Sequence, residues 1–158
     1  MKTKGIVYFG VLVALVLAAA AQDKNPDFSG KWKLDTAKSD FGMMPGPTSQ
    51  TSVIDHKEPK IKITTTAARE QGEQTSEANY TLDGKESTNT MGPREIKTIA
   101  KWEGKKIVMK SKFDYQGSEI ELADTYSLSE DGKGLTIDRA IKSPMGEIAQ
   151  KMVFVKSE

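Results

Sequence analysis

Histidine and cysteine set the first limits on the chemistry of this sequence. His56 is the only histidine among the 158 residues, and there is no cysteine. A serine–histidine relay would have to use that single residue, while thiol catalysis and cysteine-based zinc sites are excluded. His56 ends a predicted strand beside Lys57 and Glu58, which favours a solvated surface position. The sequence therefore leans away from an enzyme, and it predicts no catalytic residue, metal or other cofactor.

Three polar residues near the C-terminus could instead hold the charged group of a ligand. Asp124, Arg139 and Gln150 lie on three successive segments of alternating polarity. Closing the two hairpins over their short turns pairs Arg139 with Asp124 on one side and with Gln150 on the other, facing the apolar side chains. Because an inward charge is costly unless paired, we expect Asp124 and Gln150 to hold the guanidinium, which could grip an acidic or polar head group.

The same registers supply the other predicted ligand-binding residues. Tyr126 and Met152 flank Ile137 on the inward face, and Ser111 and Thr98 extend the polar layer onto two preceding segments. Apolar space beside one polar clamp would suit a small amphipathic molecule. The alternative is that the polar groups satisfy one another and the interior is filled, so that nothing binds there.

These residues must be positioned by a sheet. From Gln50 onward, segments with period-two alternation are separated by glycine turns about every ten residues. Ten strands are predicted, at residues 30–35, 50–56, 60–67, 73–82, 85–90, 95–102, 106–115, 118–128, 135–142 and 147–155. Ten meandering strands leave two open edges unless the sheet closes, so the fold class is all-β, an up-and-down antiparallel β-barrel. Lys110, Lys112 and Asp114 alternate outward, which indicates a wet exterior.

The turns between these strands alternate in composition. Acidic-Gly-Lys turns at 83–85, 103–105 and 131–133 alternate with Gln-Gly or Met-Gly turns at 71–73, 91–93, 116–118 and 145–147. In a meander the two kinds would lie at opposite ends of the barrel. The loop at 40–47, with Met43 and Met44, would join the second end, either as an entrance flap or as a cap folded onto the core.

The first 21 residues are typical of a secretory signal. Lysines lie within residues 1–4, an apolar run covers 6–17, and four alanines end at Ala21. A membrane anchor is the alternative, but the uncharged stretch is shorter than the roughly 20 residues needed to span a bilayer. Cleavage predicts a linker at 22–27, one barrel domain at 28–158, and a secreted or periplasmic protein without stable membrane insertion.

The charges of the chain nearly balance and are spread along it. There are 23 lysines and arginines against 22 aspartates and glutamates. Nucleic-acid binding normally needs a basic excess on one face, so nucleic acid is not an expected partner. The expected partner is a small apolar or amphipathic molecule, and the sequence leaves the oligomeric state open.

The stretch Phe28-Ser29-Gly30-Lys31-Trp32-Lys33-Leu34, followed by this meander, resembles the calycins, the superfamily of lipocalins and fatty-acid-binding proteins. Its Gly-x-Trp is similar to their shared first-strand motif, and Trp102-Glu103-Gly104 is similar to a late turn of the fatty-acid-binding proteins. The resemblance covers nearly all of residues 28–156. It implies a barrel whose floor is plugged by Trp32 and a function in binding or carrying lipids or other hydrophobic ligands.

Two departures from the fatty-acid-binding proteins are visible. Their helical lid would fall at residues 40–47, where two prolines and two glycines disfavour helices. Their last strand carries an Arg-x-Tyr pair that grips a carboxylate, and Met152-Val153-Phe154 stands there instead. The prediction is a secreted binding or carrier protein with its own clamp at Arg139. The alternative is an extracytoplasmic interaction protein whose filled barrel binds a macromolecule through its rim or outer face.

Overall fold

The computed structural model describes residues 24–158, and all regular structure in that part of the chain is β-strand. The strands are β1 (Gly30–Leu34), β2 (Ser49–Lys57), β3 (Lys60–Arg69), β4 (Gly72–Thr81), β5 (Asp83–Met91), β6 (Arg94–Glu103), β7 (Lys106–Tyr115), β8 (Ser118–Leu128), β9 (Gly134–Ser143) and β10 (Gly146–Ser157). All ten predicted strands are confirmed, with ends shifted by at most two residues. The predicted signal at 1–21 lies outside the described residues.

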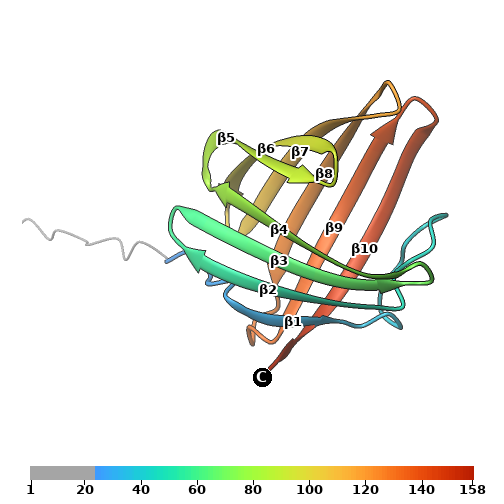
Figure 1. Cartoon of the computed structure of the whole chain (residues 1–158). Helices are drawn as coiled ribbons and strands as arrows, with labels where there is room; N and C mark the ends of the chain where they lie inside the picture. Colours follow the sequence, from blue (N-terminus) through green and yellow to red (C-terminus); the bar gives the residue numbers. More distant parts are fainter. Residues whose placement is uncertain (1–23) are drawn as a thin grey trace, which may run out of the picture.

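The strands form one antiparallel sheet that curls into a barrel. Its order is β4-β3-β2-β1-β10-β9-β8-β7-β6-β5, so β1 pairs with β10, while β4 and β5, which follow each other in the chain, form the two edges of the sheet. β1 to β4 cross steeply in front of β7 to β10 and enclose an interior between them (Figure 1). The predicted up-and-down antiparallel barrel is confirmed. Within residues 24–158, no helix is long and apolar enough to cross a membrane.

The two ends of the barrel differ, as the turn pattern predicts. The acidic-Gly-Lys turns follow β4, β6 and β8 and lie at one end, which we call the floor; the turns after β3, β5, β7 and β9 lie at the other, which we call the rim. Gly104 and Gly132 of the floor turns have φ values of 61° and 69°, a backbone conformation that glycine adopts without strain. The glycine spacing therefore marks real hairpins.

Apolar side chains fill the floor half of the interior. Trp32 and Phe28 are fully buried there, and the Trp32 indole nitrogen donates to the Phe28 carbonyl at 3.0 Å. Large aromatic side chains each bury roughly 150–250 Å² and dominate the energetics of such a core. The other buried apolar members are Leu34, Ile54, Ile61, Ile63, Leu82, Ala100, Ile107, Met109, Tyr126, Leu135, Ile137, Met152 and Phe154. The segment before β1 thus folds under the barrel and closes the floor.

His56 belongs to this floor, so the prediction of a surface histidine is wrong. Its side chain is only 4% exposed, and its ring packs near the rings of Phe28 and Trp102. Its Nδ1 accepts the backbone N–H of Phe28 at 3.3 Å, while Nε2 lies 3.5 Å from a Glu58 carboxylate oxygen. The sequence pattern failed here because Phe28, which covers the ring, precedes the first strand and has no predicted partner. Trp102 packs against the core.

The loop between β1 and β2 is tied down along β10. Asp40 and Lys151 exchange two backbone hydrogen bonds of 2.7 Å, and the Ser39 hydroxyl accepts the backbone N–H of Val153. Phe41 packs against the core, whereas the Met43 side chain is 89% exposed. Residues 40–47 contain no helix. The loop therefore caps the interior as far as Phe41, and its methionines project from that cap.

β4 and β5 do not pair through backbone hydrogen bonds. Instead, side chains of β5 bond to the backbone of β4. The Asn89 side chain accepts the backbone N–H of Asn79 at 2.8 Å and donates to the Asn79 carbonyl at 3.0 Å. The Ser87 hydroxyl accepts the backbone N–H of Thr81 at 3.2 Å. These three bonds join β5 to β4 at Asn79 and Thr81, where backbone pairing between the two strands is missing.

Replacing Asn89 with alanine should loosen this junction between β4 and β5. The substitution removes both bonds to Asn79, and each lost bond is worth about 1 kcal/mol. We expect faster hydrogen–deuterium exchange at the Asn79 amide and a melting temperature lower by a few degrees. Thr88→Ala, an exposed neighbour on the same strand, is the control. If the Asn79 amide exchanges at the same rate in Asn89→Ala and in Thr88→Ala, the Asn89 side chain does not hold β5 against β4.

Candidate functional site

Arg139 and Asp124 form an ion pair inside the barrel. The register places Arg139 directly across from Asp124 on β8 and from Gln150 on β10, as predicted. Nε and Nη2 of the guanidinium donate to the two carboxylate oxygens of Asp124, each at 2.7 Å. Such a bidentate, charge-assisted pair is among the strongest hydrogen-bonded contacts in proteins.

The pair is not sealed from solvent, although it faces inward. The Arg139 side chain is 29% exposed and that of Asp124 is 11% exposed. A guanidinium carries five N–H donors, and Asp124 takes only two of them. Among residues 24–158, no other acceptor is hydrogen-bonded to Arg139, so both donors on Nη1 remain available. Arg139 therefore faces inward, is partly reached by solvent and keeps unused cationic donors.

Two tyrosines share the electrostatic environment of the pair. Burial disfavours the charge on Arg139, but the nearby carboxylate of Asp124 outweighs it and raises the arginine pKa above its ordinary value. Burial also raises the pKa of Tyr126 and of Tyr80, and the Asp124 charge adds to both shifts. At neutral pH Arg139 therefore stays charged and both phenols stay protonated.

Gln150 does not hold the guanidinium, and that prediction is corrected. Its side-chain nitrogen donates to the Phe41 carbonyl at 3.0 Å, and within the described part of the chain it makes no hydrogen bond to Arg139. The Phe41 carbonyl also accepts the backbone N–H of Met44 at 3.3 Å. Strand pairing alone could not place that loop against β10. Gln150 consequently fixes the cap beside the site.

The other predicted site residues occupy rows on either side of the ion pair. Thr98 and Ser111 lie one row nearer the rim, and their hydroxyl oxygens are 2.8 Å apart. Tyr126 and Met152 lie one row nearer the floor, both buried, with Ile137 between them. The seven predicted residues thus lie in three neighbouring inward rows, and among residues 24–158 only Asp124 bonds directly to Arg139.

Sequence reasoning missed a second set of hydroxyls on the opposite part of the inner wall. Ser52 is paired with the buried Trp32 and is itself buried, which fixes its side chain on the inward face. Thr65 and then Ser76 continue the same row across β3 and β4. The pairing register of the first hairpins, read in the same way as that of the last two, predicts this row from the sequence.

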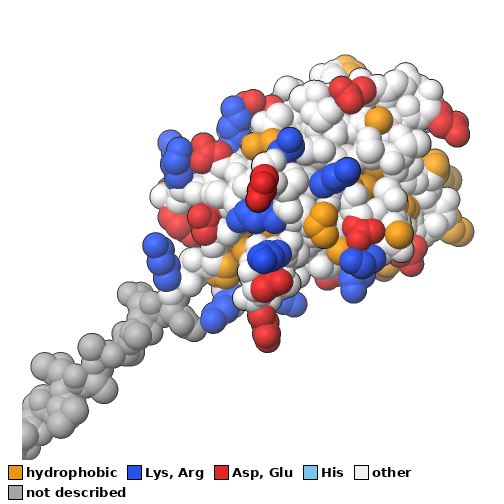
Figure 2. Space-filling model, turned by 90° about the horizontal axis from the view of Figure 1, so that it is seen from below, with side chains coloured by type: hydrophobic (Ala, Val, Ile, Leu, Met, Phe, Trp, Pro, Cys, Tyr) orange, Lys and Arg blue, Asp and Glu red, His pale blue; other side chains and the backbone are white. Residues whose placement is uncertain are grey.

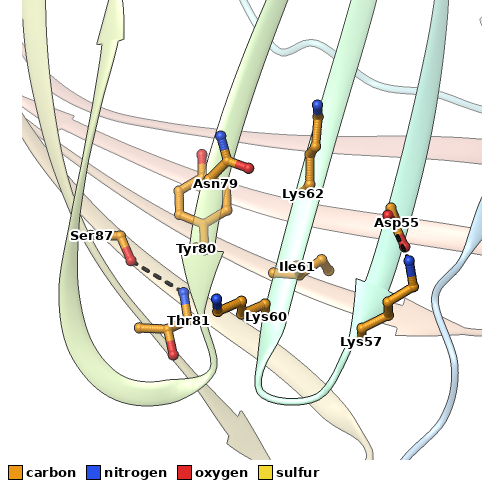
Figure 3. Close-up of a pocket in the computed structure, with 9 residues that line it drawn as sticks. All are labelled: Asp55, Lys57, Lys60, Ile61, Lys62, Asn79, Tyr80, Thr81 and Ser87. Atoms are coloured by element: carbon orange, nitrogen blue, oxygen red, sulfur yellow. Dashed lines mark hydrogen bonds and ion pairs between the residues drawn. The ribbon is translucent and has the colours of Figure 1, made fainter.

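A depression of about 440 Å³ opens on the outer side of β2 to β5, and its lining also includes the inward-facing Ile61 and Tyr80 (Figure 3). Lys57 and Asp55 form an exposed ion pair of 3.3 Å there, and neither Arg139 nor Asp124 lines it. Exposed pairs contribute about 0–1 kcal/mol, so this is a solvated outer face. Among residues 24–158, no group of three His, Asp or Glu side chains is placed to hold a metal ion.

Comparison with known proteins establishes the fold. No protein-family profile and no curated sequence matches the chain. A variant of the fluorescent protein UnaG is similar in structure, with 18% identity over 83% of this chain and 96% of that chain, and a TM-score of 0.59. A variant of the fatty acid transporter REP1-NXSQ has 18% identity, covers 82% and 98%, and scores 0.57. Zebrafish ileal bile acid-binding protein with cholic acid has 17% identity, covers 82% and 98%, and scores 0.56.

These likenesses concern the fold, because the sequence identities are below 20%. The chain has the calycin fold of the fatty-acid-binding-protein type, as its Gly-x-Trp motif and its strand meander indicate. A single fold of this kind hosts many functions, so function must be argued from the site itself.

Tyr126 should make the protein lose stability at alkaline pH. Its folded-state pKa is raised above the ordinary value of 10.0, so its contribution is complete below pH 10 and is lost as the pH rises further. We expect the free energy of unfolding to fall by up to roughly 1.4 kcal/mol per pH unit above pH 10 from this group. In Tyr126→Phe this part of the loss should vanish.

Denaturant unfolding at a series of pH values measures this effect. Tyr115→Phe is the matched control, because Tyr115 is exposed at the rim, and it should follow the unmodified protein. The assignment is refuted if Tyr126→Phe and the unmodified protein lose stability equally between pH 9 and pH 11.

Proposed function

We propose that this protein binds a small amphipathic molecule in its barrel, with Arg139 gripping an acidic or polar head group. The observation that carries the proposal is an inward-facing guanidinium that is paired with Asp124 yet keeps free donors and is 29% exposed. If Arg139 and Asp124 served only to bond to each other, neither side chain would need to be accessible to solvent. Asp124 orients the guanidinium, so little rotamer entropy is lost when a head group binds.

Apolar space for the rest of the ligand lies next to the clamp. Leu122, Ile141 and Ile148 face inward on β8 to β10, one row nearer the rim than Arg139, and all three are half-buried. Covering such surface contributes about 25 cal/mol per Å² of apolar area. The ligand would thus gain affinity from its apolar body and orientation from Arg139.

The structural neighbours are consistent with this proposal. One is a fatty acid transporter, and another is a bile acid-binding protein in complex with cholic acid. Both names refer to amphipathic carboxylates. In this chain the anchor would come from β8 and β9, because the last strand carries Met152 and Phe154 in place of the Arg-x-Tyr pair.

We extend the proposal to a carrier role outside the cytoplasm. It is supported by the signal-like composition of residues 1–21. Acidic and basic side chains are interspersed over the face seen in Figure 2, with no surface of a single sign. Such a face suits a soluble carrier of small molecules better than a nucleic-acid-binding protein.

A second candidate function rests on the rim. Met43 and Met145 are 89% and 97% exposed, and Met91 is also exposed. Methionine side chains adapt to varied apolar partners, so these loops could contact a macromolecule. The accessible lumen at Arg139 favours the small-molecule function, since a barrel that served only as a platform would be filled.

Arg139→Lys should weaken the binding of laurate, a single-chain carboxylate probe. Lysine keeps the positive charge but loses the planar fork that serves Asp124 and the ligand together. We expect about a tenfold rise in the dissociation constant, as for loss of one hydrogen bond to a charged group. Isothermal titration calorimetry measures it. Lys142→Met, which removes an outward cation of the same strand, should leave laurate binding unchanged.

A second variant separates binding from folding. Arg139→Met alone strands the Asp124 carboxylate, whereas Arg139→Met with Asp124→Asn removes both charges together. The double variant should stay folded by circular dichroism and lose laurate binding. Undiminished laurate affinity in this folded double variant would mean that the ion pair is purely structural.

A further inference from the structure

The inner wall of the barrel is divided into a hydroxyl-bearing part and an aliphatic part. On β2 to β4, one inward row consists of Ser52, Thr65 and Ser76. On β5 to β7, another consists of Ser87, Thr98 and Ser111. That second row continues across β8 to β10 as Leu122, Ile141 and Ile148. The change from hydroxyl to aliphatic side chains falls between β7 and β8, next to the ion pair.

The hydroxyl part retains hydrogen-bonding capacity for a ligand. Ser52 pairs with Thr65 at 3.3 Å, and Thr98 with Ser111 at 2.8 Å. Ser52 and Thr98 are buried, whereas Thr65 and Ser111 are half-buried. Because each hydroxyl has one donor and two acceptor sites, the mutual bonds leave sites on Thr65 and Ser111 that a ligand could use. Ser76 faces inward by register and is exposed, which shows that solvent reaches this wall.

The position of Arg139 fixes how a ligand would lie against the two parts. Its row runs Ala100–Met109–Asp124–Arg139–Gln150, immediately on the floor side of the divided row. A head group held by Arg139 therefore directs the rest of the ligand toward the rim, between Ser111 and Thr98 on one side and Leu122 and Ile141 on the other.

We propose that the ligand is a rigid facial amphiphile with an anionic end, having polar groups along one face and an apolar opposite face. This inference rests on the proposed function, since it describes the ligand of the same lumen. A single aliphatic chain would cover the hydroxyl wall without offering it hydrogen bonds, and desolvating an unpartnered polar group costs about 1–3 kcal/mol. A molecule with hydroxyl or carbonyl groups along one face satisfies that wall and still presents an apolar face to Leu122, Ile141 and Ile148.

Two carboxylate probes of different shape test the proposal. Cholate is a rigid ring system with hydroxyls on one face, and laurate is a flexible chain without them. Calorimetry should give cholate a dissociation constant at least about tenfold lower than that of laurate, the effect of one or two additional hydrogen bonds.

A pair of matched variants identifies the wall responsible. Thr65→Val with Ser76→Ala removes two inward hydroxyls, while Thr66→Val with Thr75→Ala removes an outward pair from the same two strands. The inward variant should weaken cholate by about tenfold and change laurate by less than about twofold. The outward variant should change neither. If the inward double variant does not fold, the single change Ser76→Ala at an exposed position is used in its place. We expect it to lower the affinity for cholate by about threefold.

The outcomes separate this inference from the proposed function. The facial-amphiphile inference is refuted if laurate binds as tightly as cholate, or if the inward variant leaves the affinity for cholate unchanged. Either result would leave the proposed role of Arg139 in binding the head group intact. If neither probe binds at any accessible concentration, the lumen function fails together with the inference built on it.

Discussion

A charged pair inside an apolar barrel is the constraint on which the rest of the structure depends. Arg139 and Asp124 can face inward only if β8 and β9 are in one register, because a shift of one residue would turn every side chain to the other face. The bidentate contact of 2.7 Å fixes that register chemically. The same register sets the rows above and below, which become the polar layer, the aliphatic wall and the buried floor.

The interior is closed unequally around this pair. Phe28 and Trp32 seal the floor, with His56 packed against Phe28 and Trp102, so the apolar half of the barrel is a solid core. Toward the rim the walls stay accessible, and the loop carrying Phe41 covers only part of the opening through its bond to Gln150. Between β4 and β5 the wall is closed by side chains rather than by a ladder. The floor of the barrel is thus a packed core, whereas the rim and the β4–β5 edge are held by fewer contacts.

The strands and their pairing could be predicted from the sequence where period-two alternation is combined with short glycine turns. These fixed all ten strands and the pairing of Asp124 with Arg139, since a hairpin with a tight turn permits few registers. The sequence was insufficient where segments outside strands make tertiary contacts. His56 is covered by Phe28, which precedes β1, and Gln150 bonds to a loop carbonyl, so neither environment leaves a local pattern. The clip from Asn89 to Asn79 is invisible for the same reason, because a side chain there takes the place of a backbone partner.

The central claim is that Arg139 is both neutralised by Asp124 and reachable by a ligand in the lumen. The side-chain Nε–H resonance of Arg139, followed by NMR while laurate is added, tests it most directly. The account predicts an Nε–H signal protected from exchange in the free protein, because it is bonded to Asp124, and a large shift of the Arg139 guanidinium signals that saturates with bound laurate. Guanidinium signals that stay unmoved while methyl signals of Leu122 and Ile141 shift would contradict it.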